Sequence, residues 1–385
     1  MQPLLGGSVA HLPQGRRPRD RPNTMHHTWR PNLAEFPEQP GVYLFRNARG
    51  AVLYIGKALN LRRRIASYFH QRRRQPPRLR RMIGRARAVT MHETGSELEA
   101  LLLESRLIKQ ERPPFNQLLI AYVALPFVKL TLGESFPRLV LTRELIPDGS
   151  QYLGPFPRVE IAAVVLAALQ RLLPLRTCDA AILPGVFPTP CEAFHLRKCA
   201  APCVGPHVAA TYHQHVEGLL ALLTRGHAEI LRRLREERQQ AADSMFFERA
   251  GHLHTLLAAL DEATIGQPLA LLPVALRNFV GIFTRAMPHT YEMFCIRHGL
   301  FAGRFVGVGK PDDWQAVETF LTRCYGATDD ALRAGEAVVD ELRIVAGWLQ
   351  RTHARARWVH LDAPINTLAA LEVVMSALSS PRSAT

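Results

Sequence analysis

The sequence has no long hydrophobic run. A helical membrane span needs roughly 18 consecutive apolar residues, and no segment of the 385-residue chain reaches that length. The N-terminus also lacks the apolar core that a secretory signal peptide requires. These absences argue against a membrane-spanning or secreted protein and predict a cytoplasmic one. Disulfide bonds among the six cysteines are therefore not expected.

A second absence concerns negative charge, because no aspartate or glutamate lies between Glu38 and Glu93. A short basic run is usually a solvated face, but a run of this length indicates a surface that follows a phosphate backbone. The formal net charge of +15 also predicts a polyanionic partner, with nucleic acid as the first candidate. The fourteen cationic residues in this gap are Arg46, Arg49, Lys57, Arg62, Arg63, Arg64, Arg72, Arg73, Arg74, Arg78, Arg80, Arg81, Arg85 and Arg87.

Residues 1–35 contain too few apolar side chains to bury a core. Arginine and proline are frequent in this stretch, which is typical of a flexible basic arm. Translation from Met25 instead of Met1 would remove most of the arm, and the sequence does not decide between these starts. The whole chain, with 47% hydrophobic residues, is long enough for two or three domains of about 100 to 200 residues each.

The segment after the arm is predicted to be a compact α+β module. Two alternating apolar stretches flank the turn-prone residues 47–50, a pattern typical of a β-hairpin. Helical and extended patterns then follow as far as the Pro113-Pro114 pair. The expected strands are 42–45, 52–55 and 88–92, and the expected helices are 59–69, 78–87 and 97–110.

The Gly56-Lys57 pair does not complete a nucleotide-binding loop. A Walker A motif needs an earlier glycine at position 51 and a serine or threonine at position 58. Both positions are alanine, and Gly50 is one residue out of register. We therefore expect no nucleotide cofactor, and Lys57 needs another function.

The predicted helix 97–110 holds one carboxylate that neither capping nor the helix dipole explains. Ser96 and Glu99 have capping-box spacing, and Glu97 lies in the first turn, where the helix dipole favours an anion. Glu104 instead has apolar neighbours one turn away on both sides. A lone buried carboxylate is costly unless it is paired or binds a metal. Glu104 is therefore either a functional residue or half of a buried salt bridge with an arginine.

Two segments together carry a resemblance to a known family. PGVYLFRNARGAVLYIGKALNLRRRIASYF and the later SELEALLLESRLIKQERPPFN resemble the GIY-YIG nuclease domain in the form found in the UvrC excinuclease subunit and the Cho nuclease. Both tyrosine motifs, the Gly-Lys pair, the glutamate helix and the terminal Pro-x-Phe-Asn occur in order. The resemblance implies a phosphodiester hydrolase that uses Mg²⁺ or Mn²⁺. The active site that it implies consists of Tyr43, Tyr54, Lys57, Arg64, Glu104 and Asn116.

These residue types suit phosphodiester hydrolysis. A cation held by Glu104 would cover the phosphate and the leaving oxygen, while Lys57 and Arg64 would stabilise the developing negative charge. Tyr54 would be the general base in the family's mechanism, which requires nearby cations to stabilise a phenolate whose ordinary pKa is about 10. The remaining two residues would position water, phosphate or the carboxylate. Contacts to the flanking DNA backbone are predicted for Arg62, Arg63, Arg72, Arg73, Arg74, Arg78 and Arg81.

The resemblance continues past the nuclease domain. YLGPFPRVEIAAVVLAALQRLLPLRTC and CEAFHLRKCAAPCVG resemble the segment that follows this domain in UvrC. The gaps between their cysteines match no zinc-ribbon spacing. The resemblance favours an iron–sulfur cluster of the 4Fe-4S type, with zinc and unligated thiols as alternatives. The four cysteines are Cys178, Cys191, Cys199 and Cys203, whereas Cys295 and Cys324 are expected to be isolated core residues.

Helical periodicity runs from about residue 208 to residue 263. Within it, ERQQAADSMFFERAGHLHTLLAAL resembles the UVR helical hairpin through which UvrC binds UvrB, with a hairpin packed only on its own chain as the alternative. Residues 278–310 alternate like strands around a turn near His298-Gly299. The expected organisation is a basic arm at 1–35, a GIY-YIG nuclease domain at 36–122, a linker and cysteine-rich domain at 123–207, a UVR-like hairpin at 208–265 and an α+β C-terminal region at 266–385.

The resemblance covers roughly residues 36–325 and implies a single metal-dependent incision in DNA, 3′ to a lesion, in nucleotide excision repair. UvrB, with UvrA upstream, would be the protein partner. UvrC continues into an RNase H-like nuclease and helix-hairpin-helix modules, for which this chain is expected to be too short. The alternatives are a non-catalytic accessory protein that binds DNA or UvrB, and a branched-DNA nuclease that works without UvrB.

Overall fold

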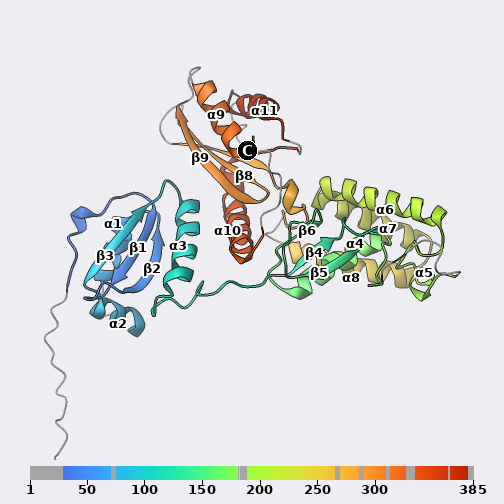
Figure 1. Cartoon of the computed structure of the whole chain (residues 1–385), viewed down its shortest axis with the longest axis horizontal. Helices are drawn as coiled ribbons and strands as arrows, with labels where there is room; N and C mark the ends of the chain where they lie inside the picture. The colour runs from blue at the N-terminus through green and yellow to red at the C-terminus, as the bar shows by residue number, and fades with distance from the viewer. Residues whose placement is uncertain are drawn as a thin grey trace, which may run out of the picture.

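The computed structural model describes residues 29–70, 75–180, 182, 189–264, 269–285, 290–308, 313–326, 334–362 and 365–379. Most of the predicted basic arm lies outside this part, as do Arg72, Arg73 and Arg74. Within it, the chain has the predicted α+β class, with three antiparallel sheets and flanking helices (Figure 1). No helix of the described residues combines the length and apolarity needed to cross a membrane.

The N-terminal module is a three-stranded sheet in the order β2-β1-β3 with helices on both faces (Figure 1). Its strands are β1 (Gly41–Arg46), β2 (Val52–Ala58) and β3 (Ala88–Glu93), and a short 3-10 helix, η1 (Leu33–Glu35), precedes them. Its helices are α1 (Leu61–Phe69), α2 (Pro77–Arg85) and α3 (Glu97–Glu111). All six elements expected here from the sequence are present, so the prediction for this module is confirmed.

Side-chain alternation along β1 produces the layers of this module, because successive strand residues point to opposite faces of a sheet. Tyr43 and Phe45 pack in one cluster with residues of α1 and α2. Val42 and Leu44 pack in a second cluster with residues of α3. The sheet is therefore enclosed between α1 and α2 on one face and α3 on the other.

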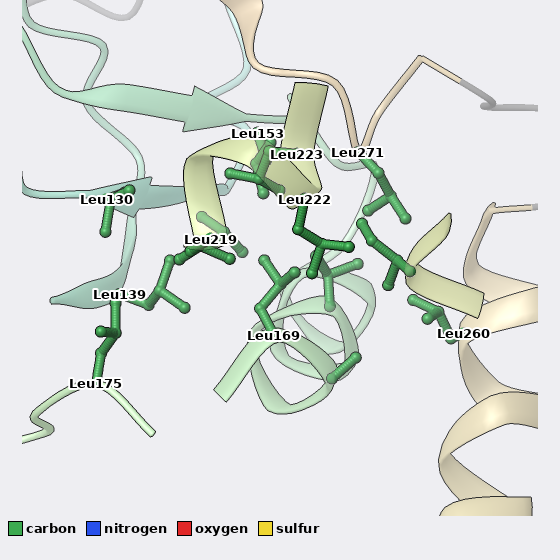
Figure 2. Close-up of a cluster of buried hydrophobic side chains, with 14 of the residues drawn as sticks. Leu130, Leu139, Leu153, Leu169, Leu175, Leu219, Leu222, Leu223, Leu260 and Leu271 are labelled. Carbon is green, nitrogen blue, oxygen red and sulfur yellow. The ribbon is translucent and has the colours of Figure 1, made fainter. Parts of the chain in front are cut away.

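The chain continues into a unit built around one large apolar core. Its sheet has the order β5-β4-β6 and consists of β4 (Phe127–Leu130), β5 (Leu139–Thr142) and β6 (Gln151–Leu153). Its helices are α4 (Val159–Leu172), α5 (Glu192–His195), α6 (Pro206–Thr224), α7 (His227–Asp243) and α8 (Phe247–Thr264). Figure 2 shows leucines of this core, including Leu130, Leu139, Leu169, Leu219 and Leu260. The sheet, α4 and the helices of the predicted hairpin therefore share one core.

The C-terminal unit has a sheet in the order β10-β7-β8-β9. The strands are β7 (Phe279–Thr284), β8 (Thr290–Arg297), β9 (Leu300–Val308) and β10 (Arg357–His360). The helices are α9 (Asp313–Tyr325), α10 (Glu336–Thr352) and α11 (Thr367–Ser379), with 3-10 helices η3 (Val274–Leu276) and η4 (His353–Arg355). One apolar cluster joins the sheet to α9 and α11, and another joins it to α10. The turn expected near His298-Gly299 connects β8 to β9.

Helix α3 contacts this C-terminal unit as well as its own sheet (Figure 1). Its Leu98 is fully buried in the cluster that contains Phe294 of β8 and Trp348 of α10. Nearby, Arg304 of β9 forms an ion pair with Glu99, with 3.4 Å between Nε and Oε2. The helix that carries Glu104 is therefore held on two sides.

Candidate active site

An open cavity of about 670 Å³ lies where β1, β2, α1 and α3 meet. Five of the six residues in the implied active site line it, namely Tyr43, Tyr54, Lys57, Arg64 and Glu104. Asn116 is not among the lining residues. Side chains from two strands and two helices thus meet at one cavity wall.

The backbone of β2 approaches the side chain of Tyr43 very closely. Tyr43 and Gly56 are partners in the antiparallel register of β1 and β2. A Cβ atom on Gly56 would lie 2.4 Å from the Tyr43 Oη atom, which is closer than van der Waals contact allows. Glycine is therefore required at position 56 for the Tyr43 phenol to reach the cavity.

A hydrogen-bonded group on α1 fixes the Tyr43 hydroxyl. The hydroxyls of Tyr43 and Tyr68 are 2.7 Å apart, and Arg64 Nε donates to the Tyr43 hydroxyl at 3.3 Å. The Arg64 guanidinium also lies 5.3 Å from the centre of the Tyr68 ring. Sequence reasoning gave Tyr68 no function, although it follows Arg64 by four residues, which places both on one face of the helix.

Burial controls the protonation of the cavity tyrosines. It raises the pKa of Tyr43 and of Tyr54 well above the ordinary value for a phenol. For Tyr54, the neighbouring Tyr68 and Glu104 raise the pKa further, and Arg64 opposes them only in part. Within the protein alone, Arg64 favours a Tyr54 phenolate too weakly to offset burial, Tyr68 and Glu104, contrary to what a general base at this position requires. The base would need a further positive charge in the cavity.

Glu104 is half-buried, and its carboxylate faces the cavity. One of its two oxygens is hydrogen-bonded to the protein. Oε1 accepts a hydrogen bond from the Lys57 backbone N–H at 2.9 Å, and no described residue donates to Oε2. Burial raises the pKa of Glu104, against the lowering effect of Lys57 and Arg64. No described arginine or lysine forms an ion pair with this carboxylate, so the salt-bridge alternative finds no partner in the described chain.

The residues present fit a divalent cation held by one protein ligand. The described residues contain no group of three or more His, Cys, Asp or Glu side chains arranged around a common metal position. Mg²⁺ is commonly bound by one or two carboxylates, with water and substrate phosphate completing the shell. A single carboxylate with an unpaired oxygen in an open cavity matches that donor set.

Lys57 and Asn116 of the implied site also have partners within the protein. The Lys57 ammonium forms an ion pair with Glu97 at 3.2 Å, so its charge is shared with the first turn of α3. The side-chain amide of Asn116 accepts from the Ile55 N–H and donates to the Ile55 carbonyl, both at 2.9 Å. Asn116 therefore holds β2, the strand that carries Tyr54 and Lys57, in place through two hydrogen bonds.

The arginines that are predicted to contact the flanking DNA backbone differ in their surroundings. Arg63 lines the cavity, and Arg81 is exposed on α2. Arg62 instead forms an ion pair with Glu38 and donates to the Phe36 carbonyl. Arg78 donates to backbone carbonyls of the segment 114–116. Arg63 and Arg81 are thus better placed than Arg62 and Arg78 to meet a ligand.

The four cysteines of the middle unit do not have a metal-binding arrangement among the described residues. Cys178 and Cys191 are exposed, Cys203 is half-buried and Cys199 is buried. Burial raises the pKa of Cys199, and the other three thiols raise it further, so the four lie in one neighbourhood. The iron–sulfur or zinc assignment stays a prediction. Cys295 and Cys324 are buried as expected, but their thiols interact with each other and are not isolated.

Comparison with known proteins agrees with the order of these motifs. The family described as the UvrC-like GIY-YIG domain matches residues 39–117. The family described as the UvrC/Cho excinuclease middle domain matches residues 125–222. The N-terminal module and its cavity therefore form a GIY-YIG domain. More narrowly, the chain carries a UvrC-like GIY-YIG domain followed by a UvrC/Cho excinuclease middle domain.

The relatives extend this similarity across most of the chain. The UvrABC system protein C of Clostridium acetobutylicum is 29% identical over 338 residues, covering 86% of this chain and 54% of the relative. That of Desulforudis audaxviator is 33% identical over 324 residues, covering 82% and 52%. This chain therefore spans about half the length of these relatives. The N-terminal endonuclease domain of UvrC from Thermotoga maritima, solved with magnesium as its catalytic divalent cation, is 38% identical over 22% of this chain and 91% of its own, with a TM-score of 0.20.

Proposed function

We propose that this protein is a metal-dependent DNA endonuclease that makes a single incision, 3′ to a lesion, in nucleotide excision repair. One observation carries the proposal. The half-buried Glu104 carboxylate presents an oxygen that has no partner among the described residues to a cavity that also contains Arg64 and the cavity tyrosines. The similarity to UvrABC system protein C supports DNA as the substrate, and the excess of basic residues supports a polyanion.

In this mechanism a Mg²⁺ or Mn²⁺ ion at Glu104 would supply Lewis-acid stabilisation of the scissile phosphate and the leaving oxygen. Arg64, anchored by Tyr43 and Tyr68, would direct a fixed positive charge toward the phosphate. Tyr54 would accept the proton of the attacking water once the bound charges lower its pKa. Arg63 would hold the DNA backbone at the cavity edge.

The experiment measures incision of a duplex with a single lesion in Mg²⁺ or Mn²⁺, with and without UvrA and UvrB. Glu104→Ala removes the proposed ligand, and Glu111→Ala removes an exposed glutamate at the end of the same helix as a matched control. We expect the wild type and Glu111→Ala to cut and Glu104→Ala not to cut. Equal cutting by all three proteins would contradict the role of Glu104, and cutting by none under any condition would leave the accessory-protein alternative. Cutting of branched DNA without UvrB and not of the lesion duplex would favour the branched-DNA nuclease.

A second observation supports a docking function for the helical hairpin. Met245, Phe246 and Phe247, at the turn from α7 into the first residue of α8, have exposed fractions of 76%, 62% and 69%. Three adjacent exposed apolar side chains are unusual on a free surface and are typical of a contact with another protein. Together with the resemblance of this hairpin to the UVR motif, they support UvrB as the partner.

A further inference from the structure

A second cavity lies away from the candidate active site, at a junction of three parts of the chain. It has a volume of about 120 Å³. One wall comes from the turn after β6, a second from the segment that leads into β7, and a third from α10 and β10. Its larger apolar lining residues are Leu269, Phe279, Leu349 and Trp358. Nothing in the proposed nuclease function uses this cavity.

Arg277 brings a positive charge into this apolar wall. The residue follows η3 directly and is only 3% exposed. Its Nε donates to the Leu272 carbonyl at 2.9 Å, and its Nη2 donates to the carbonyls of Leu272 at 2.8 Å and Ala270 at 3.4 Å. A guanidinium has five N–H groups. Three of them are used in this way, and both N–H groups of Nη1 lack a partner among the described residues.

No described carboxylate forms an ion pair with Arg277, and no neighbouring charge offsets its burial, which lowers the pKa of Arg277 to about 9. A charged group buried without a counter-ion is costly, because it loses its hydration and gains no opposite charge. The backbone carbonyls that accept hydrogen bonds from Arg277 replace part of its lost hydration, but they are dipoles and carry no net negative charge. Arg277 lines this cavity, which therefore offers an anion a place beside the guanidinium.

We propose that this cavity binds a compact organic anion, with an apolar body about the size of one aromatic ring and a single carboxylate that meets the Arg277 guanidinium. The volume of about 120 Å³ limits the size, because a somewhat larger protein cavity, of about 150 Å³, holds one benzene molecule. The single charge follows from the single uncompensated cation, because a dianion would leave a net charge against an apolar wall. A carboxylate matches the paired N–H groups of arginine.

The polar residues at the cavity agree with this orientation. Besides Arg277, the lining includes Gln350 in the last turn of α10 and His353 at the start of η4. Their side chains can hydrogen-bond to a carboxylate, while the rest of the wall excludes water from the ring. Inorganic phosphate and chloride have no apolar body to fill the cavity, so they should bind more weakly than an aromatic carboxylate.

Benzoate is the probe for this site, and benzyl alcohol is its neutral counterpart of similar shape. Thermal unfolding and titration calorimetry of the full chain should show a saturable rise in Tm with benzoate, because a ligand that binds only the folded state stabilises it. Benzyl alcohol, chloride and phosphate should bind at least tenfold more weakly. Absence of a saturable effect of benzoate, or an equal effect of chloride, would overturn the proposal.

Two substitutions on α10 provide the matched pair. Ala346→Leu fills the cavity without altering Arg277, and Gly347→Ala adds a methyl group on the same helix outside the lining. Benzoate binding should be lost in Ala346→Leu and retained in Gly347→Ala, with the unfolding transition confirming that both fold. Unchanged binding in Ala346→Leu would contradict the proposed location. These measurements do not involve DNA cutting, so they stand or fall independently of the proposed nuclease function.

Discussion

Lys109 of α3 and Asp340 of α10 form a buried ion pair, with 2.8 Å between Nζ and Oδ2 and exposed side-chain fractions of 5% and 13%. Ser105 completes the group by donating from Oγ to the same Asp340 oxygen at 2.6 Å. Ser105 and Lys109 lie one and five residues after Glu104 on α3. The C-terminal unit therefore holds the helix that supplies the proposed metal ligand.

Removing one partner of this pair should destabilise the protein strongly. Lys109→Met leaves the Asp340 carboxylate buried without its main counter-charge, which costs about 3–5 kcal/mol of unfolding free energy. Replacing both residues, as in Lys109→Met with Asp340→Leu, should cost less than the single substitution. Denaturant unfolding measures the difference. Glu336→Gln, an exposed change on α10, is the control and should stay within about 0.5 kcal/mol. A single variant as stable as this control would contradict the prediction.

The same pair predicts acid sensitivity. Burial alone would raise the pKa of Asp340, but hydrogen bonds from Lys109, Ser105 and Arg343 lower it overall. Because the folded-state pKa lies below the unfolded value, the carboxylate stabilises the fold above about pH 4 and loses this effect as the pH falls through the folded pKa. Unfolding free energies of wild type and Asp340→Asn should therefore converge below about pH 4. A gap that stays constant with pH would exclude this linkage.

Gly56→Ala should impair cutting more than folding. The new methyl group would collide with the Tyr43 hydroxyl at 2.4 Å, displacing the phenol that Arg64 contacts. Such overpacking costs about 1–3 kcal/mol, and we expect the incision rate to fall by at least tenfold. Gly84→Ala on α2 is the control, because its Cβ would meet no atom within 4 Å. That variant should be as active as wild type and as stable or more stable. Normal cutting by Gly56→Ala would show that the Tyr43 position is unimportant.

The pH dependence of incision tests Tyr54 as the base. Tyr68 raises the pKa of Tyr54 in addition to burial. Tyr68→Phe removes the hydroxyl responsible, so the alkaline rise in the incision rate should move to lower pH, even if the maximal rate falls. Tyr54→Phe should lose this rise and about 10²- to 10⁴-fold in rate. Single-turnover rates across pH measure both effects. An unchanged profile in Tyr54→Phe would assign the base elsewhere.

The exposed residues Met245, Phe246 and Phe247, at the turn from α7 into α8, should affect binding without affecting folding. Phe246→Ser with Phe247→Ser removes much of the apolar contact surface, and we expect binding to UvrB to weaken by at least tenfold, in line with the energy of buried aromatic anchors. The Tm should hardly change, because both side chains are exposed. Leu368→Ser on α11, also exposed, is the control. Equal binding by all three proteins would support a hairpin that packs only on its own chain.

Local patterns predicted much of the N-terminal module. Alternation over 42–45, helical spacing over 97–110 and the Ser96 cap determine elements through contacts between near neighbours, and these elements form as expected. The order of the tyrosine, lysine, arginine and glutamate motifs also identified side chains that meet at the cavity. Short-range propensity and motif spacing were sufficient there, because each residue's face follows from its own strand or helix.

Contacts between distant segments were decided only by the tertiary structure. Tyr68 meets Tyr43 across 25 positions, and Lys109 meets Asp340 across 231. Nothing local distinguishes these residues from ordinary surface or core positions, because their partners are set by how whole sheets and helices pack. The sequence by itself predicted the resemblance to UvrC, the elements of the N-terminal module and five of the side chains that line the cavity. Three features became visible only in the tertiary structure. Asn116 holds β2 by hydrogen bonds, the C-terminal unit contacts α3 through the Lys109–Asp340 ion pair, and Arg277 is buried beside a cavity.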